Sequence, residues 1–280
     1  MEKIAIAMDG VAANPHAVDF ACYLARLTNS KVTGIFLENL IANQKVIVGE
    51  TYGHKYLEWT IDKDSDEYRE KMEEVEKNER LFKDACDKRA ARYSIHRKGG
   101  EPSKEVIRES RYADVLVINA ETSFNREYEG VPTEFVKEVL KGSECPVIIA
   151  PESFERIDEI VFTWNASMSS MFAIKQFCYL FPQLEDKKVK VLQVQNDGYE
   201  TDREEFEIFK EWLSSHYSSV VFEILKGDAE TELFANLYEK KNIIVVIGAY
   251  GRSTVSQFFK HSHANLLVKT LSQAIFIAHC

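Results

Sequence analysis

The stretch Ile243–Thr270, IIVVIGAYGRSTVSQFFKHSHANLLVKT, decides the fold class of this chain. Its first five residues are all apolar and predict a strand buried on both faces, which is typical of a parallel sheet covered by helices. Gly248 and Gly251 follow, and Ser262 precedes an apolar helical pattern. Glycine lets the backbone approach an anion, and the first turn of a helix offers unpaired N–H groups and a positive dipole end. The stretch therefore predicts a strand, a phosphate-binding loop and a helix.

The composition is that of a globular protein with room for two domains: 280 residues, 45% apolar and 29% charged. The net charge of −10 argues against broad binding to nucleic acid or to anionic membranes, because both depend on summed basic charge. The chain shows neither the order of a signal peptide nor an apolar run of membrane-spanning length. Its five cysteines form no CxxC pair, which suits a reducing compartment. We therefore expect a cytoplasmic protein.

Strand-like segments of the first half recur in the same order in the second half. The paired segments are Lys3–Gly10 with Glu159–Ala166, Lys31–Asn39 with Lys188–Asn196, Tyr93–Pro102 with Phe222–Ala229, Asp114–Ala120 with Ile243–Ala249, and Pro146–Ala150 with Ala274–Ala278. Helical patterns separate the strands, and this alternation predicts a parallel sheet wrapped in helices. Each half is thus predicted to be a doubly wound α/β domain with five parallel strands, the first over residues 1–151 and the second over residues 157–280.

The first half is longer between its second and third strands, which predicts an insertion at about residues 41–64. Its mixed apolar, glycine and aromatic content fits a lid or an interface loop, and a neutral surface excursion fits equally well. The following segment, Asp66–Ala91, is highly charged but predicts one long amphipathic helix packed on the sheet. Its apolar face consists of Tyr68, Met72, Val75, Phe82 and Cys86.

Ligands of parallel α/β sheets bind beyond the carboxyl ends of the strands, which directs attention to the residues that follow each strand. In the second half Gly248 and Gly251 can admit a phosphate, Ser262 can cap it, and Arg252 and His261 can supply charge. Alternatively, Gly248 only turns the chain and Ser262 only caps a helix. No GK[ST] follows the glycines and no GxGxxG opens the chain, so a Walker loop and a dinucleotide fingerprint are excluded.

The arrangement resembles the universal stress protein family, in which GxxG, nine residues and G[ST] follow the fourth of five parallel strands. Gly248, Gly251 and Ser262 stand in that register. With the internal repeat, the resemblance implies a tandem member built from two adenine nucleotide alpha hydrolase-like domains and acting in stress response or signalling. It further implies ATP or a related adenine nucleotide, with magnesium, in the C-terminal domain, where Asn165 and Val194 border the ribose and adenine and Arg252 balances charge.

Two departures concern the second half. His261 stands where the family pattern has glycine, so its imidazole can crowd the phosphates or, when protonated, contact them. Asn165 replaces the acidic residue that many members carry after strand one.

The first half shows the reverse departure. Asp9 supplies the acidic residue, but Asn119 and Thr122 occupy the positions of the two glycines. A degenerate first site is therefore predicted. Asp9 can equally well be a cap for the helix that begins near Asn14.

No constellation predicts catalysis. The chain has no GxSxG and no evident base to activate a water, so it is not expected to be an enzyme beyond slow ATP hydrolysis. A dedicated metal site is not expected either, because His261 and His263 do not share a helical face and neither CxxC nor HExxH is present.

Two further readings stay open. A scaffold that binds a protein partner, with both nucleotide sites decayed, is the competing function. A nucleotide-dependent transferase would need a substrate motif that the chain lacks. We expect the halves to pack as an internal pseudo-dimer through their last strands or adjoining faces, and a homodimer of two chains is compatible with the resemblance.

Overall fold

The computed structural model describes residues 1–38, 44–51, 54–61, 63–125, 127–195, 202–238, 240–248 and 273–278. Residues 44–51 and 54–61 are described by their backbone alone. The predicted phosphate loop after Gly248, which includes Gly251, Arg252, His261 and Ser262, lies outside the described residues.

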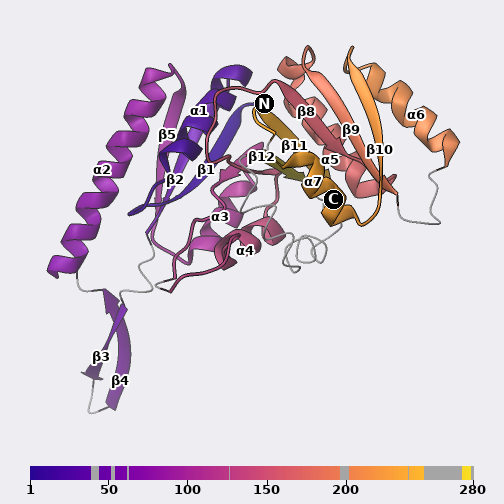
Figure 1. Cartoon of the computed structure of the whole chain (residues 1–280). Coiled ribbons are helices and arrows are strands. Elements are labelled where there is room, and N and C mark those ends of the chain that lie inside the picture. Colours follow the sequence, from indigo (N-terminus) through magenta and orange to yellow (C-terminus); the bar gives the residue numbers. More distant parts are fainter. Residues whose placement is uncertain are drawn as a thin grey trace.

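Ten strands form one sheet in the order β10-β9-β8-β11-β12-β7-β6-β1-β2-β5 (Figure 1). The first half supplies β1 (Lys3–Asp9), β2 (Lys31–Leu37), β5 (Arg92–Lys98), β6 (Val115–Ile118) and β7 (Val147–Ile149). The second half supplies β8 (Glu159–Thr163), β9 (Lys188–Gln195), β10 (Val220–Lys226), β11 (Ile243–Gly248) and β12 (Ala274–Ala278). The central strands are buried on both faces, as their continuous apolar runs predict.

All neighbouring strands are parallel within each half, whereas β7 and β12 pair antiparallel where the halves meet. Ile275 lies opposite Ile149, and Ile277 lies opposite Val147. The predicted α/β class with a mostly parallel sheet is confirmed. The sequence pattern suggested two separate sheets, but the last strands join them into one. The domain boundaries at residues 151 and 157 stay a prediction.

Helices cover both faces of the sheet (Figure 1). One face carries α1 (Pro15–Thr28), α2 (Asp66–Lys88), α5 (Met168–Leu180) and α6 (Arg203–Ser214). The other face carries α3 (Pro102–Ser110), α4 (Glu134–Gly142) and α7 (Ala229–Leu237). Each face has its own apolar core. This is the two-layer covering that doubly wound connections produce.

The predicted amphipathic helix is α2. Ser65 caps its first turn, and Val75, Phe82 and Cys86 are buried. The helix ends at Lys88 rather than Ala91, because Ala90 adopts a left-handed conformation with φ of 52°. Such a residue ends a helix rather than extending it.

The predicted insertion contains a β-hairpin, where a loop was expected. Strands β3 (Gln44–Thr51) and β4 (His54–Ile61) pair antiparallel in a sheet of their own. Both segments are rich in β-branched and aromatic residues, which favour strands. The hairpin projects from the body of the molecule beyond the first turn of α2 (Figure 1).

Candidate functional site

The candidate site lies where the strand order reverses in the second half. The chain leaves β8 toward β9 and β10, then returns to place β11 on the other side of β8. The Thr163 hydroxyl donates to the carbonyl oxygen of Val246 at 3.0 Å and ties the two strand ends together. Asn165 and Gly248 stand at these ends. Ligands of open α/β sheets bind at such a reversal, and the first half has the equivalent point between β1 and β6.

Asn165 takes part in the turn that starts α5. Its Oδ1 accepts hydrogen bonds from the hydroxyl of Ser167 at 2.6 Å and from the N–H of Ser167 at 3.3 Å. Ser167 in turn accepts from the N–H of Ser170 and caps the helix, as side chains of this type do. The intervening Ala166 has a φ of 59°. The Asn165 side chain is exposed, but its acceptor oxygen already serves the fold.

Gly248 lies against the backbone of α5. A Cβ at this position would come within 2.4 Å of the carbonyl carbon and oxygen of Ser169 and of the nitrogen of Ser170. Real Cβ atoms essentially never come that close. Packing of helix on strand therefore requires a glycine here, whether or not a phosphate binds.

Val194 lies near the end of β9, opposite Leu225 of β10, and is half-buried. Strand β8 ends at Thr163, which pairs with Leu192. Val194 thus stands beyond the end of β8, on the same edge of the sheet as Asn165. Its apolar side chain would give a ligand contact surface and no hydrogen bond.

In the first half, Asp9 ends β1 and its Oδ1 accepts from the N–H of Val11 at 2.9 Å. Burial raises the pKa of this carboxyl above its ordinary value, against the opposing effects of the Val11 and Ala12 N–H groups and of Lys71. The alternative in which Asp9 caps the following helix is wrong. Asn14 caps α1, accepting from the N–H groups of His16 and Ala17, because it is adjacent to the first turn and Asp9 is not.

Asn119 is buried and holds the loop that follows β6. Its Oδ1 accepts from the N–H of Glu121 at 2.8 Å, and its carbonyl oxygen accepts from the N–H of Thr122. Thr133 caps α4 and donates its hydroxyl to the carbonyl of Thr122. Asn119 and Thr122, which stand where the universal stress protein pattern has glycines, thus take part in hydrogen bonds within the loop after β6.

Sequence reasoning missed Asn78. This buried residue of α2 donates from its amide to the carbonyl oxygens of Gly10 and Val11 at 2.9 and 2.8 Å. Val75 also packs on Gly10, since a Cβ there would meet its methyl group at 3.0 Å. Helix α2 therefore covers the end of β1. The available signal was the position of Asn78 between Val75 and Phe82 on the apolar face of the helix.

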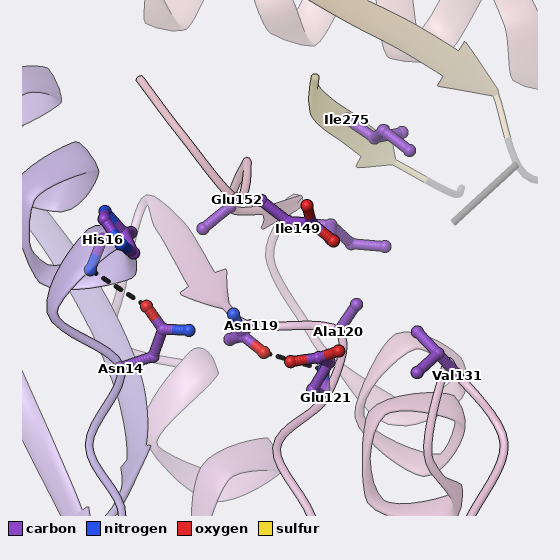
Figure 2. Close-up of a pocket in the computed structure, with 10 residues that line it drawn as sticks. Asn14, His16, Asn119, Ala120, Glu121, Val131, Ile149, Glu152 and Ile275 are labelled. Carbon is purple, nitrogen blue, oxygen red and sulfur yellow. Dashed lines mark hydrogen bonds between the residues drawn. The ribbon is translucent and has the colours of Figure 1, made fainter. Parts of the chain in front are cut away.

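A cavity of about 200 Å³ lies at the carboxyl ends of strands β6 and β7 in the first half (Figure 2). The figure shows Asn14 and His16 at the start of α1, Asn119 and Glu121 after β6, and Ile149 at the end of β7. Ligand pockets for drug-sized molecules usually measure from about 300 Å³ upward. The cavity is too small for a whole nucleotide.

A charged cluster, also missed in the sequence, lies under α3. The buried Glu109 accepts from Lys98 at 2.7 Å and pairs with His96 at 3.1 Å and Lys3 at 3.6 Å. Burial acts to raise the pKa of this carboxyl, but the hydrogen bonds from Lys98 and His96 outweigh it and hold the pKa below its ordinary range. The cluster ties α3 to β1 and β5. Within the described residues, no group of three or more His, Cys, Asp or Glu side chains is arranged to hold a metal ion.

No family model matches the chain, and no curated protein sequence matches it. Solved structures do. A universal stress protein from Archaeoglobus fulgidus DSM 4304 is similar over 98% of both chains, with a TM-score of 0.70 and 13% identity. A functionally unknown protein from Pseudomonas aeruginosa PAO1 gives a TM-score of 0.60 at 10% identity, over 100% of this chain and 92% of that one. The cytoplasmic domain of a prokaryotic cation chloride cotransporter gives 0.50 at 8% identity, over 99% and 94%.

These identities are low, so the similarity concerns the fold. The chain has the fold of the universal stress proteins, and the agreement extends over both halves. The cotransporter domain shows that this fold also occurs as part of another class of protein. The fold alone therefore does not define the function of this chain. Among the described helices, none has both the length and the apolar composition needed to cross a membrane.

Proposed function

We propose that this protein binds ATP or a related adenine nucleotide at the carboxyl edge of its second half and acts in a cytoplasmic stress response or in signalling. One observation carries the proposal: Asn165 and Gly248 flank the point where β8 and β11 part and where α5 begins. A strand-order reversal beside the start of a helix is the usual ligand site of an open α/β sheet.

In this proposal the phosphates are held by the segment after Gly248, in which Gly251, Ser262, Arg252 and His261 have the residue types that bind anions. Val194 borders the adenine. A magnesium ion would bind mainly through phosphate oxygens and water. The first half serves as the partner of an internal pseudo-dimer rather than as a second site, because its loop is folded on Asn119 and its cavity is small. We propose no catalytic cycle.

Calorimetric titration with ATP and AMP tests the proposal, together with chromatography of nucleotide released when the purified protein is denatured. Gly251→Val should abolish the heat of binding and leave the melting temperature unchanged. Gly130→Val is the matched control, since no atom of the described residues lies within 4 Å of a Cβ there, and it should bind as the wild type does. His261→Gly should tighten ATP binding if the imidazole crowds the phosphates.

A scaffold for a protein partner is the second candidate, and two observations favour it. The Oδ1 atoms of Asp9, Asn119 and Asn165 each accept an internal hydrogen bond. A mostly apolar groove of about 270 Å³ also lies between α5 and α6, lined by Trp164, Met171, Ile208, Phe209, Trp212, Lys175 and Glu205. Ile208 is 61% exposed. Protein that releases no nucleotide and gives no heat with ATP or AMP would refute nucleotide binding and leave the scaffold.

A further inference from the structure

Two cysteines from distant parts of the chain meet in the core of the first half. Cys22 lies on α1 and Cys86 on α2, and both are fully buried. Their sulfur atoms are 3.4 Å apart. Two thiols at this distance share a hydrogen bond, and a small shift of either side chain brings the sulfurs into bonding range.

The two thiols are not equivalent. The hydrogen bond from Cys86 lowers the pKa of Cys22, against the opposing effect of burial, and the guanidinium of Arg89 acts to lower the pKa of both thiols. The same hydrogen bond and burial raise the pKa of Cys86. Arg89 is held beside α1 by its ion pair with Asp19 at 2.8 Å. The opposite directions of the two pKa shifts make Cys22 the thiol closer to its thiolate form.

We propose that Cys22 and Cys86 form a reversible dithiol–disulfide pair that a peroxide oxidises. The Cys22 thiolate attacks one oxygen of hydrogen peroxide, gives a sulfenic acid and releases hydroxide. The proton that Cys22 gave up neutralises this hydroxide to water. The Cys86 sulfur then attacks the Cys22 sulfur, so that an S–S bond forms, and the sulfenic hydroxyl takes the Cys86 proton and leaves as the second water. Two thiols and one peroxide thus give one disulfide and two waters, and an external thiol reverses the step.

The bond would tie α1 to α2 and close a loop that contains the hairpin β3–β4. It would also fix the helix that covers the end of β1, because Asn78 and Val75 hold Gly10 from α2. Oxidation would therefore act on the carboxyl edge of the first half. The inference does not depend on nucleotide binding in the second half.

The test uses the folded 280-residue chain with Cys280→Ser, which removes the thiol at that position. Reduced protein is treated with hydrogen peroxide, its remaining thiols are alkylated in denaturant, and its peptides are identified by mass spectrometry. We expect one linked pair of peptides, Cys22 with Cys86, that dithiothreitol separates. The melting temperature should rise by about 5 °C or more on oxidation, since closing a long loop restricts the unfolded chain.

Cys178 provides a matched control. It is buried on α5, the helix after β8, and burial raises its pKa to about 12 in a contact with Tyr217 rather than with a thiol. Cys178→Ala should leave the linked peptides and the thermal shift intact, whereas Cys86→Ala should abolish both. The proposal is overturned if peroxide leaves both thiols alkylatable, carries them to sulfinic acids, or links them only after unfolding.

Discussion

A glycine at position 248 has two explanations: helix α5 packs directly against it, or a bound phosphate needs it. Gly248→Ala tests the first explanation in the absence of ligand. The added Cβ would stand 2.4 Å from three backbone atoms of Ser169 and Ser170, where ordinary contact begins at 3.4 Å. Backbone atoms cannot rotate away as the end of a side chain can. Relief requires the first turn of α5 to move by about 1 Å, because cores are close-packed and shift only as whole elements.

The expected loss of stability follows from that displacement. Forcing an extra methyl group into a packed site usually costs about 1–3 kcal/mol, and an obstacle made of backbone favours the upper end. Replacing glycine by alanine restricts the unfolded chain and returns about 0.4–1 kcal/mol. We therefore expect Gly248→Ala to lower the free energy of unfolding by about 2 kcal/mol and the melting temperature by roughly 4–8 °C.

Urea denaturation followed by circular dichroism measures this difference in the absence of nucleotide. Gly130→Ala is the first control, because within the described residues nothing lies within 4 Å of its Cβ. Gly142→Ala is the second, because its nearest neighbour is the mobile Cδ1 of Ile107, and it should lose less than about 1 kcal/mol. If Gly248→Ala proves as stable as Gly130→Ala, the helix does not press on the strand and the glycine is there for another reason.

Three further substitutions test the first half. Asn14→Ala should lower the free energy of unfolding by about 1 kcal/mol in thermal melts, because it removes the cap of α1. Asp9→Asn should raise the free energy of unfolding at pH 7, since burial raises the pKa of Asp9 and the ionised form opposes folding above that pKa; a loss of stability at pH 7 would contradict this. Glu109→Gln should cost about 1–3 kcal/mol at pH 7 by weakening the contacts with Lys98 and His96. The folded pKa of Glu109 is lowered, so its contribution is present above about pH 4.3 and is lost as the pH falls through the folded pKa. Acid titration of both proteins should therefore bring the two stabilities together at low pH.

The fold was readable from the sequence because its signals are local. The apolar runs at Ile4–Met8 and Ile243–Ile247 are too short for spanning helices and too continuous for half-exposed strands, which leaves buried parallel strands. The antiparallel junction of β7 with β12 was not readable as a specific pairing. Both strands are apolar on both faces, so either neighbour would satisfy them, and their direction depends on how two distant halves meet.

The site was less readable, because the hydrogen-bond partners of its residues are not part of the sequence pattern. Asp9 was singled out as the acidic residue at the end of a strand, and Asn119 as the residue that replaces a glycine of the family pattern. The sequence pattern does not reveal that the N–H groups of Val11 and Glu121 donate hydrogen bonds to these two side chains. Asn78 was missed for a related reason. A single polar residue on an apolar helical face has no evident role in the sequence, because its partners at the end of β1 are known only from the structure.

These internal hydrogen bonds limit how a nucleotide could be held in the second half. The Asn165 oxygen accepts hydrogen bonds from Ser167, and the backbone of α5 packs closely against Gly248. Polar recognition must then come from the segment that follows Gly248, through its main-chain N–H groups and its cationic side chains, as in other anion sites at helix starts. Substitutions at Asn165 and Gly248 should therefore change stability more than affinity, and Gly251→Val should change affinity more than stability. If Gly251→Val and Asn165→Ala weaken ATP binding equally at unchanged stability, the side-chain contacts of the turn before α5 belong to the ligand after all.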